Sequence, residues 1–154
     1  MKTASKRKQA AERIPTAEFA MKLIAAEDFE TFYAENVSQM QALTLSQYLQ
    51  ELCEQKGIKQ HELICSIDID RIYGHKIFSG ERNPSRDYVL KLAVGMQLTI
   101  DEAQRLLIIS KNSPLYARVP RDAALLHCLH SKAGYEKTQE NLHKWGMTTL
   151  GEQR

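Results

Sequence analysis

The sequence predicts an all-α protein. Apolar residues recur at intervals of three and four along most of the chain, no segment shows a convincing alternation of apolar and polar residues, and capping residues precede several apolar runs. The composition, with 43% hydrophobic and 26% charged residues, is typical of a soluble globular protein. A chain of 154 residues buries about two thirds of its unfolded surface, so the fold requires no metal or disulfide.

The sequence also bears on the compartment. No apolar run approaches the roughly 20 residues of a membrane span, and the basic start is not followed by the apolar stretch of a secretory signal. The cysteines are odd in number and scattered within apolar helical patterns, so they are expected to be buried and reduced: Cys53, Cys65 and Cys128. We therefore expect a cytoplasmic protein with no membrane partner.

Charge is unevenly distributed over the N-terminal part of the chain. The net charge of +2 is too small to indicate a polyanionic partner by itself. Residues 1–15 are expected to form a mobile basic tail containing Lys2, Lys6, Arg7, Lys8 and Arg13. From Ile14 to Lys56, seven acidic residues outnumber two lysines, so this region would repel phosphate. Any nucleic-acid surface is expected farther along the chain.

A helical extension is expected over residues 16–43. Thr16 can cap a helix that carries Phe19 and Leu23 at helical spacing and extends toward Phe29. Ile24 continues this spacing, and Phe32 and Tyr33 lie beyond it.

The following residues predict a series of short helices. Thr44 and Gln47 form a capping box that opens a helix ending at Gly57. Two short helices are expected next, at about 60–66 and 71–78. The later helix starts are marked by Ser85, by a second capping box of Thr99 and Glu102, by Pro120 and by Gly134.

The two short helices carry a specific implication. Helices of fewer than ten residues are not stable alone, because nucleation costs more than so short a helix recovers. They must therefore pack on each other across their tight turn. The helix-turn-helix is the arrangement that keeps two such helices crossed steeply, and it presents the second helix to the DNA major groove.

Several landmarks resemble one known family. They are "YLQELCEQKGIKQHELI", Ile69 after the turn, Ile77 in the second short helix, and "SGERNPS" before the next helix. In this register the chain resembles the phage-repressor-like, Xre-type helix-turn-helix proteins from about Leu45 to Leu107. "DRIYGHKIFSGERNPSRD", continuing with "LTIDEAQRLL" and "PLYARVPRDAALL", is similar to a subgroup of bacterial transcriptional regulators.

The resemblance implies a fold and a domain organisation. Residues 44–110 would form a lambda-repressor-like domain of five helices that binds double-stranded DNA. Residues 16–43 and 111–154 would be helical extensions on either side. No cofactor is implied, and nothing indicates a small-molecule effector, an operator sequence, or activation as opposed to repression.

The resemblance also implies DNA-contacting residues. The positions that face the groove in the family correspond here to Arg71, Ile72, His75 and Lys76, and Arg71 could fork onto guanine O6 and N7. Contacts to phosphates are implied for Gln60, Tyr73, Arg82, Asn83 and Arg86. The alternative for each of these residues is ordinary solvated surface, and for Tyr73 it is packing at the rim of the core.

The chain departs from the family pattern at four positions. Ile64 stands where a small residue is usual, and Gly74 stands where a branched apolar residue is usual. If these two face each other across the helix pair, the exchange conserves volume. Asp68 replaces a turn glycine that usually has positive φ. Glu81 stands where a cation would help to bind phosphate, and five acidic residues balance five basic ones from residue 58 to 90.

Other functions are weakly indicated. His127, Cys128 and His130 could suggest a zinc site or a nucleophile, but no fourth ligand, orienting acid or oxyanion-binding group accompanies them. We therefore expect no metal and no enzymatic activity. The two function classes left open are a sequence-specific DNA-binding transcriptional regulator and an antitoxin-like or adaptor module that binds protein and has lost strong DNA binding.

Self-association is the last expectation. Members of the family commonly bind two-fold related half-sites, so a homodimer is expected. Both flanks offer apolar residues: Phe19, Leu23, Phe29, Phe32 and Tyr33 on the N-terminal side, and Leu125, Leu129, Leu142 and Trp145 on the C-terminal side. The C-terminal flank is favoured because the N-terminal segment is acidic; the alternative is that both flanks cover the chain's own core.

Overall fold

The computed structural model describes residues 14–40 and 43–151, and in these residues the chain is all-helical. It divides into two compact units, one ending at Ala42 and the other beginning at Leu43. The division lies within one residue of the boundary expected at 43/44. The tail predicted for residues 1–15 falls mostly outside the described residues.

The first unit contains α2 (Thr16–Ala25), α3 (Phe29–Asn36) and a short 3-10 helix, η1 (Val37–Gln39). The single helix expected toward Phe29 is thus two helices. Asp28 makes the break, because its side chain accepts hydrogen bonds from the backbone N–H groups of Glu30 and Thr31 and caps α3. Thr16 is not a cap, since Pro15 holds that position and no side chain bonds the first turn of α2.

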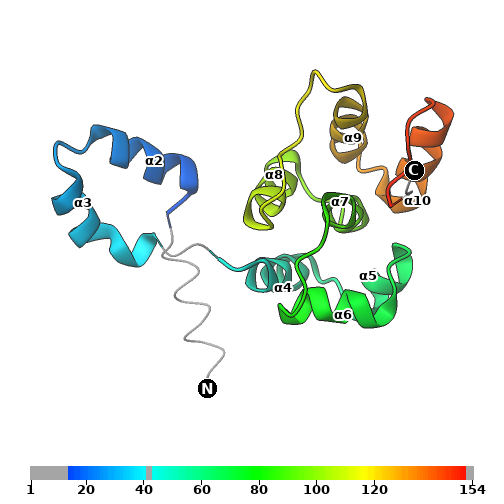
Figure 1. The fold of residues 1–154 in the computed structure, drawn as a ribbon, viewed down its shortest axis with the longest axis horizontal. Helices are drawn as coiled ribbons and strands as arrows, with labels where there is room; N and C mark the ends of the chain where they lie inside the picture. Colours follow the sequence, from blue (N-terminus) through cyan, green and yellow to red (C-terminus); the bar gives the residue numbers. More distant parts are fainter. Residues whose placement is uncertain (1–13, 41–42, 152–154) are drawn as a thin grey trace. The chain divides into compact units, whose positions relative to one another are not determined.

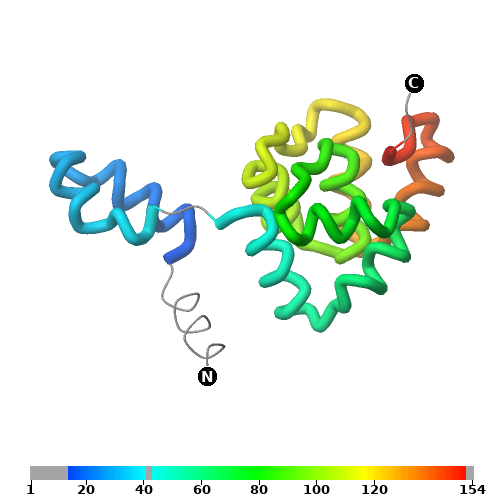
Figure 2. Tube along the Cα trace, turned by 60° about the horizontal axis from the view of Figure 1, so that its bottom comes forward, coloured from blue at the N-terminus to red at the C-terminus, as the bar shows by residue number. Residues whose placement is uncertain are grey.

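Seven helices form the second unit (Figures 1 and 2): α4 (Leu45–Lys56), α5 (Gln60–Ser66), α6 (Arg71–Ser79), α7 (Arg86–Gly95), α8 (Ile100–Ile109), α9 (Pro120–His130) and α10 (Gly134–Lys144). Their starts and ends follow the capping signals closely. Both predicted capping boxes are present, at α4 and α8, and Gly57 ends α4 in the left-handed conformation. Ser85 stands at the cap position of α7, but its side chain makes no capping bond.

The core of the second unit is arranged around α7. This helix packs against α5, α8, α9 and α10, and six consecutive residues of it, from Val89 to Val94, are buried. The helix α6 packs against both α4 and α5, and Figures 1 and 2 both show it returning to lie beside α4. This packing fixes α6 on one side and leaves its other side to solvent.

Residues 111–151 belong to this second unit and do not form a separate compact unit. Leu125, Leu129 and Leu142 are almost completely buried in the common core, and of the favoured C-terminal set only Trp145 is substantially exposed. The three leucines are therefore not available for the expected dimer contact, because their apolar surface is already covered by the chain's own helices.

Within residues 14–40 and 43–151, no helix combines the length and the apolar character that crossing a bilayer would require.

Candidate functional site

The helix α6 is divided into a buried and an exposed side. Gly74, Ile77 and Phe78 are buried, whereas Arg71 and His75 are exposed and Ile72 leaves 68% of its side-chain surface to solvent. A large apolar residue so exposed in the middle of a short helix is not required by the core. The exposed side therefore presents a cation, an imidazole and an apolar group together. The fourth predicted groove residue, Lys76, is half-buried on the same helix.

Both ends of α6 are held in place. The Asp70 carboxylate accepts a hydrogen bond from the backbone N–H of Ile72 and caps the first turn. At the other end, Ser46 and Gln50 of α4 donate hydrogen bonds to the carbonyl oxygen of Phe78. Gly80 follows at a φ of +87°, which ends the helix at little steric cost. The helix is thus anchored to α4 by polar contacts as well as by its buried side chains.

The crossing of α5 and α6 depends on Ile64 and Gly74. A Cβ atom placed on Gly74 would lie 2.6 Å from Cγ2 of Ile64, far inside the ordinary contact distance. The two positions therefore face each other, as the sequence suggested, and the large residue on α5 fits because its neighbour has no side chain. Gly95 meets Ile67 in a similarly close contact, which brings α7 near the end of α5.

The turn between α5 and α6 is fastened from outside. Asp68 has a φ of +51°, the conformation predicted for the residue that replaces a turn glycine. The Lys91 ammonium donates a hydrogen bond to the Asp68 carbonyl (2.9 Å), and the Tyr135 hydroxyl donates one to the Asp68 carboxylate (3.0 Å). Lys91 is buried, and burial lowers its pKa although the nearby carboxylates of Asp68 and Asp87 act in the opposite direction.

Gln60 contacts the exposed side of α6. Its side-chain amide nitrogen lies 2.8 Å from Nδ1 of His75, so the first residue of α5 is hydrogen-bonded to the second short helix. The rings of His61 and His75 are stacked, with centroids 5.9 Å apart. These contacts restrict the His75 ring to one orientation. Cys65, expected to be buried, is instead exposed and lies against His61.

The exposed side of α6 lines a shallow hollow of about 390 Å³. Its lining residues are Arg71, Ile72, His75, Lys76, Ser79 and Glu81. All four predicted base-contacting residues therefore share one surface. Glu81 belongs to the same surface and brings a carboxylate to a place where phosphate would otherwise be attracted.

Some of the residues predicted to contact phosphate are exposed, and others are engaged in contacts within the protein. Arg82 is exposed, and its backbone N–H bonds the carbonyl of Lys76. Tyr73 is half-buried and its ring lies against that of Tyr88, with centroids 5.2 Å apart. The packing alternative considered for Tyr73 is thus realised for its ring.

Arg86 has a structural role instead of the predicted phosphate contact. Its guanidinium forms a two-pronged ion pair with Asp122 (2.9 and 3.0 Å) and also donates to the carbonyl oxygens of Ser113 and Pro114. All these partners lie in the α8–α9 connection or in α9. The side chain is thereby committed to joining α7 to α9.

Asn83 is exposed, but its side chain makes a hydrogen bond within the protein. Its amide donates to the carbonyl of Ser110 at the end of α8, with a distance of 3.0 Å. We therefore exclude Asn83 and Arg86 from the candidate site. Sequence inspection missed this because Asp122 lies 36 positions from Arg86 and no local pattern joins them.

A second ion pair supports the first. Arg121 of α9 donates two hydrogen bonds to Asp87 of α7, and the backbone N–H of Gly151 donates to the same carboxylate. Burial alone would raise the pKa of Asp87 and of Asp122. The arginine and backbone hydrogen bonds outweigh burial at both residues, so both pKa values lie below the ordinary aspartate value.

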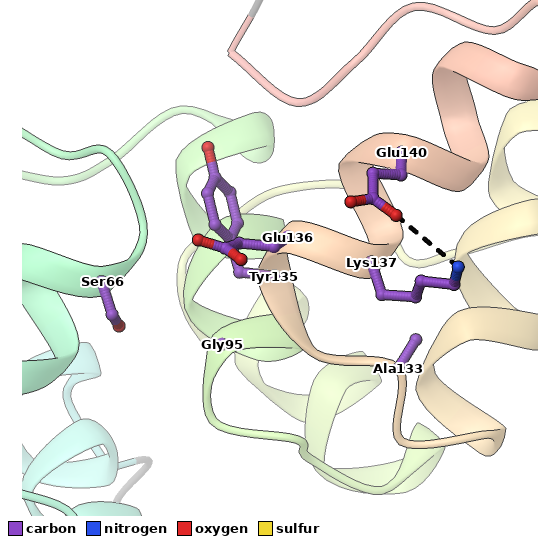
Figure 3. Close-up of a pocket in the computed structure, with 7 residues that line it drawn as sticks. All are labelled: Ser66, Gly95, Ala133, Tyr135, Glu136, Lys137 and Glu140. Atoms are coloured by element: carbon purple, nitrogen blue, oxygen red, sulfur yellow. Dashed lines mark ion pairs between the residues drawn. The ribbon is translucent and has the colours of Figure 1, made fainter.

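The second hollow of the unit lies beside α5, α7 and α10 and has a volume of about 490 Å³ (Figure 3). Its polar side chains do not converge on one point. Lys137 pairs with Glu140 at 3.5 Å, and the Ser66 hydroxyl donates to the carbonyl of Leu63. In the described part of the chain, no three His, Cys, Asp or Glu side chains are grouped so that they could hold a metal ion.

No protein-family model, curated protein or solved structure matches this chain. Any functional assignment therefore depends on the residues and their geometry alone.

Proposed function

We propose that this protein is a sequence-specific, DNA-binding transcriptional regulator of the Xre type, and that residues 44–110 form its lambda-repressor-like helix-turn-helix domain. The observation that carries the proposal is the exposed side of α6, where Arg71, Ile72 and His75 face solvent on a helix whose other side is packed against α4 and α5. In this proposal α6 is the recognition helix. Such a regulator would act on DNA in the cytoplasm.

Three of the predicted base-contacting residues of α6 have a role that suits their chemistry. Arg71, in the first turn, can donate two hydrogen bonds to O6 and N7 of a guanine. Ile72, which gains nothing from the core, can contact a thymine methyl group. Lys76, one helical turn from Ile72, can reach a guanine or a phosphate.

Gln60, the first residue of α5, contacts a DNA phosphate in this mechanism. Its amide nitrogen also lies within hydrogen-bond distance of His75. Arg82, exposed just beyond the recognition helix, is the remaining phosphate-contacting cation. The partly buried ion pairs between α7 and α9 serve the mechanism indirectly by holding the scaffold that presents α6.

The test compares Arg71→Ala with Gln60→Ala. The preferred site is first selected from a random duplex pool with the full chain, and binding isotherms are then measured on that site and on random DNA. Arg71→Ala should cost about 1 to 3 kcal/mol on the selected site and relax discrimination at one base pair. Gln60→Ala should weaken binding on all sequences alike. An equal loss for Arg71→Ala on both DNAs would contradict its proposed base contact.

A second candidate function is a protein-interaction module that keeps this fold with weak or no DNA binding. The observation that favours it is Glu81, whose carboxylate lines the same hollow as Arg71 and Lys76. A surface that carries both charges complements a protein partner that also carries both charges better than it complements a polyanion. Failure of the full chain to bind any duplex at low salt would favour this candidate.

A further inference from the structure

We propose that α2 and α3 of one chain pack against α2 and α3 of a second copy, so that the first unit is a homodimer interface. The proposal stands on this unit alone and does not depend on DNA binding. It replaces the C-terminal flank, whose apolar residues are buried in the second unit.

The helix α2 is apolar around most of its circumference. Seven of its ten residues are apolar, yet none is buried. At 100° per residue, these seven span an arc of about 240°. The charged residues outside the arc, Glu18 and Lys22, lie next to each other and their charged groups are 3.9 Å apart. A helix with so wide an apolar surface is normally covered on most sides.

The helix α3 adds a second apolar stripe. Phe29 and Tyr33 are four residues apart and their rings lie 6.0 Å from each other, with Val37 one turn farther along. All three are exposed. Glu30 borders this stripe at helical spacing, so an apolar partner laid on the stripe would leave its carboxylate at the rim.

The helix pair has almost no core of its own. Phe19 packs on Phe32 with ring centroids 5.5 Å apart, and Phe32 is the one buried residue within α2 and α3. One buried side chain does not offset the entropy lost in ordering two short helices. The unit therefore gains its stability from whatever covers the apolar surface.

The exposed area suits a dimer. The large apolar side chains left exposed on the unit are Met21 (73%), Leu23 (38%), Ile24 (83%), Phe29 (60%), Tyr33 (49%) and Val37 (44%). With about 150 to 250 Å² for a fully exposed aromatic side chain and somewhat less for an aliphatic one, they together present roughly 600 Å² of surface. That is at the upper limit of the apolar patches that monomers leave exposed, and it approaches the ~800 Å² per partner of a standard interface.

The chemistry of the surface favours a second copy over other partners. From residue 14 to 40, the chain carries five carboxylates and one lysine, so the surface of α2 and α3 itself does not attract nucleic acid or anionic lipid. A copy of the same surface offers a matching apolar face, and a two-fold axis places each stripe against its equivalent. The like charges at the rim repel weakly and are screened by salt.

The first test is the oligomeric state of the full chain, measured by sedimentation equilibrium from about 1 to about 100 µM. Wild type should be dimeric at the upper end, and Met21→Glu/Ile24→Glu should weaken association at least about tenfold. Glu favours helix, so these changes leave the propensity of α2 intact. The matched control is Ile108→Glu, which alters a residue 61% exposed on α8 and should leave the dimer unchanged. A wild type that remains monomeric throughout, or a control that dissociates equally, would overturn the proposal.

Hydrogen exchange of the wild-type chain gives a second test, which does not depend on whether a variant folds. Amides of residues 16–39 should gain protection as the protein concentration rises through the dimer range, and added salt should shift this gain to lower concentration. Amides of the second unit should not change. If α2 is equally protected at every concentration while the chain is monomeric, the chain itself covers the helix and the dimer proposal fails.

Discussion

Adding a side chain at Gly74 should destabilise the second unit, because the added atoms would overlap with Ile64. An added Cβ would lie 2.6 Å from Cγ2, 3.0 Å from Cγ1 and 3.1 Å from Cδ1 of that side chain. Ile64 has no exposed surface and cannot move toward solvent. The overlap should cost about 1 to 3 kcal/mol, offset by the ~1 kcal/mol gained when glycine leaves a helix interior. Gly74→Ala is therefore expected to destabilise by about 1 kcal/mol, and Gly74→Ile by more.

The effect should change sign when Ile64 is truncated. Ile64→Ala alone leaves a cavity and should cost about 2 to 5 kcal/mol. In that background all three crowding atoms are gone, so Gly74→Ala fills part of the cavity and keeps its gain in helix propensity. It should then stabilise by about 1 kcal/mol, which gives a coupling free energy of about 2 kcal/mol.

Equilibrium unfolding in urea measures these free energies. The fluorescence of Trp145, the single tryptophan, reports on the second unit because it lies at the end of α10 against the ring of His127. The control is Gly57→Ala, where φ is +65° and no other group lies within 4 Å. It should destabilise equally with Ile64 or Ala at position 64. Additive effects of the Gly74 and Ile64 changes would refute the packing argument.

Two further predictions concern charge. Asp122→Asn should lower the free energy of unfolding by about 2 to 4 kcal/mol at neutral pH, because it removes the carboxylate that pairs with the Arg86 guanidinium. The loss is slightly smaller than for a fully buried pair, since the Arg86 side chain is 25% exposed. The pKa values of Asp87 and Asp122 are lowered in the folded protein, so the stability that these carboxylates contribute is complete above the unfolded pKa and is lost as the pH falls through the folded pKa. When urea unfolding is measured below about pH 4, the free energy of unfolding should therefore fall less steeply with pH for Asp122→Asn than for wild type. Glu81→Lys should strengthen binding to random duplex and steepen its salt dependence by about one unit or more, whereas Glu136→Lys on α10 should not; equal effects of the two changes would mean that only net charge matters.

Local signals predicted the helices of the second unit well. The bounds of α5 were predicted without error and those of α6 to within one residue, because a capping aspartate, glycines and a proline mark the neighbouring turns. The facing of Ile64 and Gly74 was also predicted, since both depart from the usual residue in a compensating way. In contrast, apolar spacing continues across residues 26–28, and this hid the short break that Asp28 introduces.

Contacts between distant residues could not be predicted from one sequence. Arg86 has the charge and the sequence position of a DNA-contacting residue, and only its pairing with Asp122 shows a different role. Cys65 sits in an apolar pattern but on the exposed side of a seven-residue helix, where one position decides burial. Burial of the C-terminal leucines and exposure of α2 are likewise properties of tertiary packing, and together they change which flank is available for self-association.

The central claim is that the exposed side of α6 binds duplex DNA, and the salt dependence of that binding tests it most directly. The full chain is titrated onto a labelled random duplex by fluorescence anisotropy at several salt concentrations. Arg71, Lys76 and Arg82 lie on α6 or just beyond it, so they should together contribute about −2 to −3 to the slope of log K against log salt. Changing Arg71 and Lys76 to Ala should make that slope shallower by one to two units. An absence of binding at low salt, or binding whose slope is unaffected by these changes, would contradict the claim.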